Sequence, residues 1–470
     1  MTGATWSEQR LEGYLAPEQA QQYHNVPFQM PDGVRRLEVR YEYSHPIGSD
    51  PHLTGGNTLD IGLFDQRGAG YPGRGFRGWT GSARSEFFIG HDDATPGYLA
   101  GPLDPGEWNV SLGFYKSAPE GCHYTITLRF LHGDGDAPAS LPTLLTLANS
   151  HSTLPARADG WYRGELHCHS YHSDGDSDPR DLIAAAKALG LDFLAVTDHN
   201  SISHLAALAT VDPGDLVLIP GCEVTTYKGH WNVWGLEEWI DFRTLTPDLM
   251  TESIRRAVEL GYLTSCNHPR TMGPPWEFKA ITGQHCIEVW NGPWEIFNNE
   301  SLAYWESRLR QGERLVAVGG SDAHYLSRPH IARIGTPTTW IHCAGTPTAA
   351  TLLDGLRAGH AFISEAPDGP QVYLSGGSAM MGDCVPRPAS GLLDMTARVV
   401  HGDGLRLEFL GAEGRLTQVD ISGDNQSVAV AVPVGATPYV RAQLVETTGE
   451  TAALHALTNP IYITQTEVPE

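Results

Sequence analysis

Short apolar segments alternate with helix-like segments between residues 161 and 365, and this alternation most constrains the fold. Proline in a first turn and glycine just past the last turn are typical helix boundaries. Helices are expected at 179–190, 247–261, 299–311 and 346–359. A compact apolar run typical of a buried strand follows each of them, at 193–196, 262–265, 315–318 and 361–364. The alternation predicts an α/β domain with parallel strands and outer helices, either a barrel or a doubly wound sheet.

Potential metal ligands recur along this same part of the chain. In an extended strand alternate side chains share a face, so His167 and His169 can reach one ion while Cys168 points the other way. With 21 His in 470 residues, chance predicts about one such pair. The pair is therefore informative only because further potential ligands follow other strand-like runs. The full set is His167, His169, Asp174, His199, Glu223, His230, His268, Asp322 and His324. Because a barrel brings the carboxyl ends of its strands to one mouth, this set favours a barrel.

Composition and charge limit the classes of molecule that this chain is expected to bind. The formal net charge of −24 disfavours a nucleic-acid backbone or an anionic membrane as the main partner, although a small anionic substrate could bind beside metal ions. Seven scattered cysteines give no disulfide framework, which indicates reduced thiols and a cytoplasmic setting. Without a basic leader or an apolar run near 18 residues, we expect neither secretion nor a membrane span. The oligomeric state is left open.

Three domains are expected from the length and from changes in pattern. Residues 35–132 show short alternating runs such as 36–43 and 124–130, typical of an antiparallel β-sandwich. A linker rich in Ala, Ser, Pro and Thr follows over 137–160. Alternating runs return beyond residue 370. We therefore predict a β-sandwich domain at 1–150, a barrel at 160–365 and a small β-sandwich at 366–470.

Five segments together resemble the motifs of the polymerase-and-histidinol-phosphatase (PHP) family of metal-dependent phosphoesterases. They are His167-Cys168-His169 with Ser173-Asp174-Gly175, Thr197-Asp198-His199-Asn200, Gly221-Cys222-Glu223, Asn267-His268-Pro269 and Gly320-Ser321-Asp322-Ala323-His324. The resemblance spans about 161–330. Within that family, segments 229–235 and 287–292 look most like the carbaryl-hydrolase-type branch.

The resemblance implies a distorted (β/α)7 TIM-like PHP barrel, flanked here by N-terminal and C-terminal β-sandwich domains, and a cluster of two to three divalent ions. It assigns one ion to His167, His169, Glu223 and Asp322. Glu223 would bridge to a second ion held by His230 and His268, and the third would lie between Asp174, His199 and His324. Imidazole and carboxylate ligands without thiolate are compatible with Mn, Zn or Fe.

The leading functional hypothesis is hydrolysis of a small phosphomonoester or phosphodiester by a metal-bridging hydroxide. Arg270, Asp322 and His230 are the predicted catalytic residues, with Arg270 either clamping a phosphate or forming a surface ion pair. Three ions outweigh the three carboxylates of the ligand set, so the pocket favours phosphate oxygens. Two alternatives stay open: hydrolysis of a carboxylic ester, carbamate or amide at the same centre, and a non-catalytic metal-stabilised binding scaffold.

Other residues near the motifs have ordinary structural interpretations. Asn200 either orients a ligand or caps the turn after its strand. His172 is expected next to the ligand shell or in solvent, and Cys168 and Cys222 in the core. Most of the tryptophans between 231 and 305 are expected to pack in the interior. Three of them, Trp276, Trp290 and Trp294, could instead form an aromatic wall at the mouth.

Overall fold

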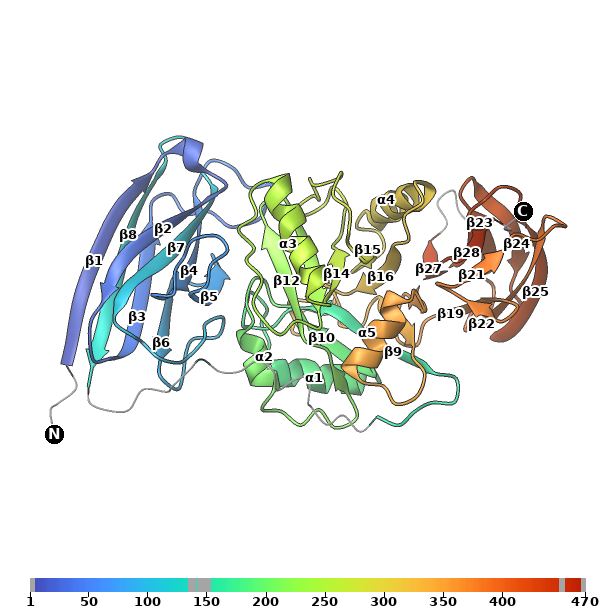
Figure 1. Cartoon of the computed structure of the whole chain (residues 1–470), viewed down its shortest axis with the longest axis horizontal. Helices are drawn as coiled ribbons and strands as arrows, with labels where there is room; N and C mark the ends of the chain where they lie inside the picture. Colours follow the sequence, from blue (N-terminus) through green and yellow to red (C-terminus); the bar gives the residue numbers. More distant parts are fainter. Residues whose placement is uncertain (1–4, 134–140, 142–153, 448–452, 466–470) are drawn as a thin grey trace, which may run out of the picture.

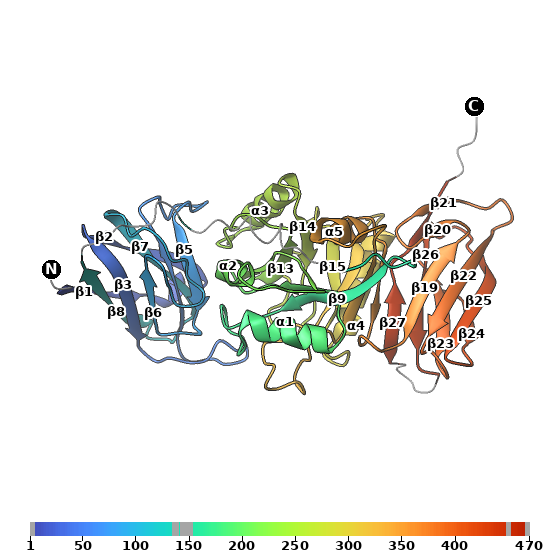
Figure 2. The ribbon, with the colours of Figure 1, turned by 90° about the horizontal axis from the view of Figure 1, so that it is seen from below.

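The computed structural model describes residues 5–133, 141, 154–447 and 453–465. They form a mixed α/β protein with much sheet, in which an N-terminal β part, a middle α/β part and a C-terminal β part follow one another along the long axis (Figure 1, Figure 2). Most of the linker expected over 137–160 lies outside the described residues. Among those described, no helix is both long and apolar enough to cross a membrane.

The N-terminal part consists of two four-stranded antiparallel sheets. The first has the order β1 (Thr5–Leu15), β8 (Cys122–His132), β3 (Val34–Tyr43), β6 (Glu86–Gly90), and the second the order β2 (Gln22–Met30), β7 (Gly106–Lys116), β4 (Thr58–Phe64), β5 (Phe76–Gly81). One apolar core contains Val39 and Ile126 from the first sheet and Ile61 and Leu112 from the second. The two sheets therefore bury one face each against the other.

Seven strands of the middle part are arranged in sequence order around a ring. They are β9 (Trp161–Cys168), β10 (Phe193–Val196), β12 (Gly221–Thr226), β13 (Gly229–Trp234), β14 (Leu263–Cys266), β15 (Cys286–Asn291) and β16 (Val316–Gly320). The first two belong to one sheet, which β11 (Val217–Leu218) extends, and the other five form a second sheet. Two single parallel bridges, His199 to Glu223 and Cys168 to Ala323, join these sheets. Both bridges lie at the carboxyl ends of the strands.

The ring departs from seven regular βα units in two places. Strand β13 is antiparallel to β12 and to β14, because β12 and β13 form a hairpin. Residues 267–285, between β14 and β15, contain no helix. The expectation of parallel strands is therefore wrong for β13, whereas β9 with β10 and β14 with β15 and β16 do run parallel.

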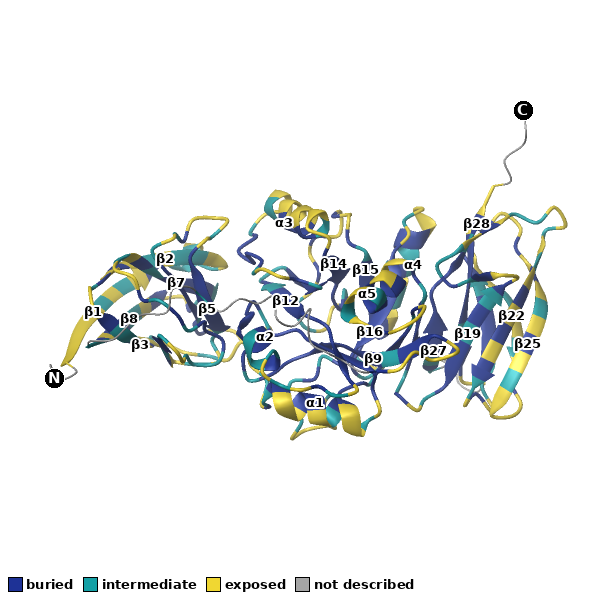
Figure 3. Cartoon of the chain, turned by 60° about the horizontal axis from the view of Figure 1, so that its bottom comes forward, coloured by how far each residue is buried: buried dark blue, intermediate teal, exposed yellow. Residues whose placement is uncertain are grey.

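The helices expected from proline and glycine boundaries are confirmed as α1 (Pro179–Ala188), α3 (Pro247–Glu259), α4 (Asn298–Arg310) and α5 (Ala349–Arg357). Asp178, Thr246 and Thr348 cap α1, α3 and α5 by accepting a backbone N–H with their side chains. The short α2 (Ser203–Leu208) was not expected, since Ile202 at its N-cap offers no side-chain acceptor. Exposed residues lie on the outer sides of α1 and α3 (Figure 3).

The C-terminal part continues a sheet of the middle part. From β9 this sheet runs through β17 (Thr338–His342), β18 (Ala361–Ser364), β27 (Leu454–Thr458), β26 (Tyr439–Val445) and β23 (Arg406–Gly411) to β24 (Gly414–Asp420). A second sheet has the order β20 (Ala379–Met380), β19 (Gln371–Gly376), β22 (Leu392–Val400), β25 (Asn425–Pro433), and β21 (Cys384–Pro386) pairs with β28 (Ile461–Thr464). Buried and exposed residues alternate along β22 (Figure 3). Strand β18, expected to run parallel, is antiparallel to both neighbours.

Candidate metal centre

All nine potential ligands lie at one end of the ring. His167 lies next to the last residue of β9, and His169 follows that strand. His199 follows β10, His268 follows β14, and Asp322 and His324 follow β16. Glu223 lies within β12, which ends three residues later. His230 is instead the second residue of its strand, yet the antiparallel direction of β13 places it opposite Thr225 at the same end. The hairpin therefore brings a ligand to the mouth that a parallel strand would have placed at the far end.

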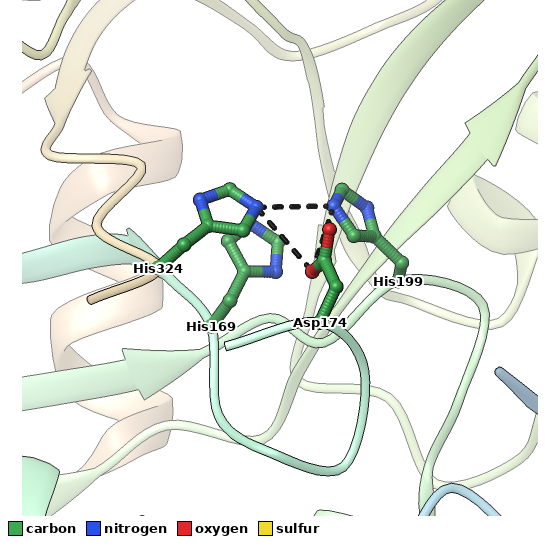
Figure 4. A group of neighbouring side chains, drawn as sticks. All are labelled: His169, Asp174, His199 and His324. Atoms are coloured by element: carbon green, nitrogen blue, oxygen red, sulfur yellow. Dashed lines mark hydrogen bonds and ion pairs between the residues drawn. The ribbon is translucent and has the colours of Figure 1, made fainter. Parts of the chain in front are cut away.

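One tight group consists of His169, Asp174, His199 and His324, whose ligand atoms lie within 4.8 Å of one another. Figure 4 shows the rings of His199 and His324 on either side of the Asp174 carboxylate. The Oδ1 atom of Asp174 lies 3.6 Å from His199 Nε2 and 3.4 Å from His324 Nε2. The two imidazoles and the carboxylate thus face a common point.

Two further groups share residues with the first. His167, His169 and Asp322 form one, with His169 Nε2 3.1 Å and His167 Nε2 3.4 Å from Asp322 Oδ1. The other joins His199 and His230 to Glu223, at 2.8 Å and 3.3 Å.

The Glu223 carboxylate is the centre of the cluster. Besides His199 and His230, its oxygens lie 3.4 Å from His167 Nε2, 3.6 Å from His169 Nε2 and 3.4 Å from His268 Nε2. This position suits a bridging carboxylate. Because His169 and His199 each belong to two groups, the assignment of ligands to separate ions stays a prediction.

Among the described residues, two buried ligand atoms, His167 Nε2 and His169 Nδ1, have no hydrogen-bond partner, and Glu223 Oε2 has an ion-pair contact with His199 Nδ1 at 2.8 Å. Buried polar atoms are nearly always paired, so such orphans at one place require an explanation. Imidazole nitrogens and carboxylate oxygens are ligands for Zn, Mn and Fe. The residues present therefore fit a site for divalent metal.

Backbone strain is concentrated at the same end of the ring. Asn200, His268 and Asp322 have positive φ angles of 55°, 28° and 52°, a conformation that costs energy for residues with side chains. Hydrogen bonds hold it in place: Asp322 N donates to His167 O at 2.8 Å, and Asn200 N donates to Glu223 O at 2.9 Å. The Asn200 side chain also bonds the backbone of Thr225 in both directions at 2.8 Å. Its role here is to join two ligand-bearing segments.

Three polar residues around the ligands had no role assigned from the sequence. Glu288 accepts from His167 Nδ1 at 2.8 Å, and Asn267 donates to Glu223 Oε1 at 2.8 Å. Asp198 accepts from Ser170 and Ser173, which orders the loop that carries Asp174. In the sequence, an acidic residue within the apolar run 286–291 is the feature that could have indicated a role for Glu288.

Mutual electrostatics keep the carboxylates ionised. Burial opposes ionisation of Glu223, but His167, His199 and His230 outweigh it and hold the pKa of the carboxyl well below its usual value. Burial, together with His324 and His199, lowers the pKa of His169 to about 4. For His199, the carboxylates of Asp174 and Glu223 outweigh burial and raise the pKa to about 9. Without an ion, protonated imidazole thus balances the carboxylates, and a bound cation would take the place of such protons.

Arg270 is buried rather than part of a surface ion pair. Its Nη1 donates to Asn291 O at 2.9 Å and to Asn298 Oδ1 at 2.7 Å, and its Nη2 donates to Asn291 Oδ1 at 2.6 Å. Asn291 in turn donates to Glu288 at 3.0 Å and to Asp322 at 3.3 Å. The guanidinium thus reaches Asp322 through Asn291, and its role as a phosphate clamp stays a prediction.

Other residues singled out in the sequence are structural. Trp276 and Trp290 are buried and donate their indole N–H to Phe278 O and Gly292 O, so only the half-buried Trp294 of the expected aromatic wall is partly open to solvent. His172 is buried, not solvent-exposed, with Nδ1 2.8 Å from Ser203 Oγ. Cys168 and Cys222 lie in the core, as expected.

Comparisons with known proteins concern mainly this part of the chain. Residues 165–262 match the PHP domain. A 5'-3' exoribonuclease of Haemophilus influenzae is 35% identical over 104 residues, which are 21% of this chain and 38% of that protein. An error-prone DNA polymerase of Cutibacterium acnes is 49% identical over 47 residues, 10% of this chain and 4% of the polymerase. The chain therefore spans well under half of the curated relatives it matches.

Two solved structures show a weaker likeness. One, a two-domain protein of Bacteroides vulgatus described as containing a predicted PHP-like metal-dependent phosphoesterase, has a TM-score of 0.36 and 15% identity over 66% of this chain and 99% of that chain. The other, an amidohydrolase of Chromobacterium violaceum with bound sulfate and no metal, has a TM-score of 0.26 and 18% identity over 35% of this chain and 88% of that chain. Such TM-scores carry no conclusion about this fold. The likeness to the PHP domain therefore rests on the matched segment, residues 165–262, together with the converging ligands.

Proposed function

We propose that this protein is a metal-dependent hydrolase that cleaves a small phosphomonoester or phosphodiester. The observation that carries the proposal is the convergence of nine imidazole and carboxylate side chains on one end of the ring, with two buried imidazole nitrogens that have no hydrogen-bond partner among the described residues. The match to the PHP domain and the exoribonuclease name of one partial relative support the same class of reaction.

The cluster would hold two to three divalent ions, of Mn, Zn or Fe. His167, His169, Glu223 and Asp322 are the proposed ligands on one side and Asp174, His199 and His324 on the other, with His230 and His268 beside Glu223. When bound, such ions lower the pKa of a water molecule toward neutrality and neutralise phosphoryl oxygens.

The protein's own residues prepare this site. Because Glu288 accepts from His167 Nδ1, the Nε2 atom of His167 would be free to bind an ion. Asn267 fixes Glu223, and Asn291 fixes Asp322. The buried carboxylate of Glu288 also lowers the positive charge that three ions would give the pocket, although the balance still favours an anionic substrate.

Exposure indicates the side from which a substrate approaches. The side chains of His167, His169 and Glu223 are at most 1% exposed, whereas those of Asp174 and Asp322 are 44% and 23% exposed. The first three thus form the floor of the site. We infer that the phosphoryl group enters over Asp174 and Asp322, with His230 at the side and Arg270 behind Asp322.

The proposal also includes the arrangement of domains, the charge of the substrate and the location of the protein. The seven-strand ring would be a distorted PHP barrel between two β-sandwich domains, with boundaries near 1–150, 160–365 and 366–470. The net charge of −24 supports a small anionic substrate over a nucleic acid or a membrane. Free cysteines throughout the described residues support a cytoplasmic location.

The test is a substrate panel with a matched pair of variants. The wild type, Glu223→Gln and the exposed-site control Glu277→Gln are assayed with p-nitrophenyl phosphate, bis-p-nitrophenyl phosphate, p-nitrophenyl acetate and a short RNA. We expect phosphoester turnover in the wild type and the control, and a loss of about 100-fold or more in Glu223→Gln. Turnover of the acetate alone would favour the ester, carbamate or amide alternative. Metal binding without any turnover would favour the scaffold.

A further inference from the structure

The N-terminal β part contacts the hairpin that carries Glu223 and His230. This hairpin turns at Tyr227 and Lys228, and the turn reaches out of the ring into the N-terminal part. Both Figure 1 and Figure 2 place β5 of the N-terminal part opposite α2 of the middle part at this junction. We propose that the N-terminal part positions the metal centre through Tyr227, which is a positioning residue for Glu223 and His230. The inference rests on the proposed metal site and deepens it.

Tyr227 is held on three sides by the N-terminal part. Its ring stacks between Tyr23 and Tyr115, with centroid distances of 5.3 Å and 5.0 Å and interplanar angles of 14° and 15°. Its hydroxyl donates to Asp60 Oδ2 at 2.9 Å. A Cβ atom on Gly113 of β7 would collide with that hydroxyl, so the strand beneath it requires glycine at this position. The fit is specific for a tyrosine.

The hairpin transmits the position of Tyr227 to the ligands. Tyr227 lies two residues after Thr225 and three before His230, and these two residues are paired across the hairpin. The turn itself is closed by Thr226, whose hydroxyl donates to Gly229 O at 2.8 Å and accepts from Lys228 N at 3.1 Å. A shift of the turn would therefore move His230 directly and Glu223 through the strand.

The N-terminal part contacts two more ligand-bearing segments. Arg84 donates to Tyr171 O at 2.6 Å, in the loop that leads to Asp174. Gly97 N donates to Ser203 Oγ at 3.0 Å, just after the segment that carries His199. Trp239 links the two parts as well, because it stacks on Phe76 at 3.9 Å and donates to Asn200 O at 3.0 Å.

Three ligand-bearing segments of the cluster are thus fixed against the same β part. An N-terminal part that served only as a separate binding module would not need to contact the segments after β9 and β10 and the β12–β13 turn. The contacts instead make the N-terminal part a support for three of the segments that carry candidate ligands. Ligands held by such supports lose less freedom when they bind a metal, which raises affinity.

Two tyrosine-to-phenylalanine variants separate this role from general stability. Tyr227→Phe removes the hydrogen bond to Asp60 and keeps the ring stack. Tyr41→Phe is the matched control, because its hydroxyl donates to Leu59 O at 2.6 Å within the N-terminal core. Tyr227→Ala removes the stack as well. In the full-length metal-free protein, the readouts are amide hydrogen exchange over 221–234 and the dissociation constant for Mn²⁺ by calorimetric titration.

We expect Tyr227→Ala to speed exchange in the hairpin and to weaken Mn²⁺ binding, each by about tenfold or more, with Tyr227→Phe intermediate. Tyr41→Phe should leave both within about twofold, even where it lowers the melting temperature equally. Unchanged exchange in Tyr227→Ala, or equal changes in Tyr41→Phe, would overturn the inference. If Tyr227→Ala does not fold, the inference is tested by Tyr227→Phe alone, through hairpin exchange and the dissociation constant for Mn²⁺. A wild type that binds no Mn²⁺ would contradict the proposed function, whereas hairpin exchange would still decide the positioning role.

Discussion

Glu288 Oε1 accepts a hydrogen bond from His167 Nδ1 at 2.8 Å across 121 positions of sequence. Its other oxygen accepts from His268 N at 3.1 Å and from Asn291 Nδ2 at 3.0 Å. One buried carboxylate thus orients two proposed ligands directly and a third, Asp322, through Asn291.

Glu288→Gln should weaken metal binding. The glutamine amide would point a donor at a group that is itself a donor, so at least one of the three hydrogen bonds is lost. Changes of this kind beside a ligand typically cost about 10- to 100-fold in metal affinity. Titration of the metal-free protein with Mn²⁺ measures the loss. The exposed Glu295→Gln, in the loop after β15, should bind as the wild type does, and equal affinities for both variants would refute the orienting role.

Gly320→Ala should disturb the same pair by steric contact alone. A Cβ atom there would overlap the His167 side chain and lie 2.9 Å from Glu288 Oε1. We expect a lower free energy of unfolding, by about 1–3 kcal/mol, and fewer bound ions per chain. Denaturant unfolding and metal analysis provide the two readouts. Gly70→Ala is the control, since its Cβ would meet nothing within 4 Å; a Gly320→Ala protein with full metal content would contradict the geometry.

Arg270→Ala tests the phosphate clamp. A phosphoryl transition state carries more negative charge than an acyl one, so kcat/KM for p-nitrophenyl phosphate should fall about tenfold more than kcat/KM for p-nitrophenyl acetate. Loss of the bonds to Asn291 and Asn298 should also lower stability, and the melting temperature records that part. Arg255→Ala on the exposed face of α3 is the control. Equal losses on both substrates would leave Arg270 a structural residue only.

The stability of the protein should depend on pH through Asp60. Burial raises the pKa of this carboxyl to about 6, against the partial effect of hydrogen bonds from Tyr227 and Ser82. Between about pH 4 and pH 6 the folded state therefore holds a proton on Asp60 that the unfolded state has released, so the contribution of Asp60 to the free energy of unfolding has a negative slope with pH in this window. The expected loss is about 2 kcal/mol. This is less than the full pKa shift implies, because Asp60 is only half-buried and solvent screens its charge.

Asp60→Asn should remove this slope. Denaturant unfolding of the wild type and the variant at pH 4, 5, 6 and 7 measures it. The exposed Asp394→Asn should retain the wild-type slope. Identical pH profiles for wild type and Asp60→Asn would show that Asp60 is already ionised at pH 4 in the folded protein.

Three candidate ligands follow strands that the apolar pattern predicts: His199 after 193–196, His268 after 262–265 and Asp322 after 315–318. The strand before His199, Phe193–Val196, was predicted to the residue. Local signals suffice where burial and periodicity agree.

What the sequence did not reveal depends on long-range contacts. The antiparallel direction of β13 follows from the tight turn at Tyr227 and Lys228, a turn that carries no Asn-Gly signal. The Glu288 contact with His167 and the insertion of Tyr227 between Tyr23 and Tyr115 join residues far apart in the chain. No local pattern distinguishes Tyr227 from any aromatic residue in an exposed turn.

The central claim, a metal site that hydrolyses phosphoesters, is tested most directly by elemental mass spectrometry of the purified full-length protein. It is paired with turnover of p-nitrophenyl phosphate and bis-p-nitrophenyl phosphate before chelation, after chelation and after the return of Mn²⁺. We predict two to three ions per chain, loss of turnover with the metal and recovery with its return. A protein that holds no metal after reconstitution, or whose turnover survives complete removal of metal, would contradict the account.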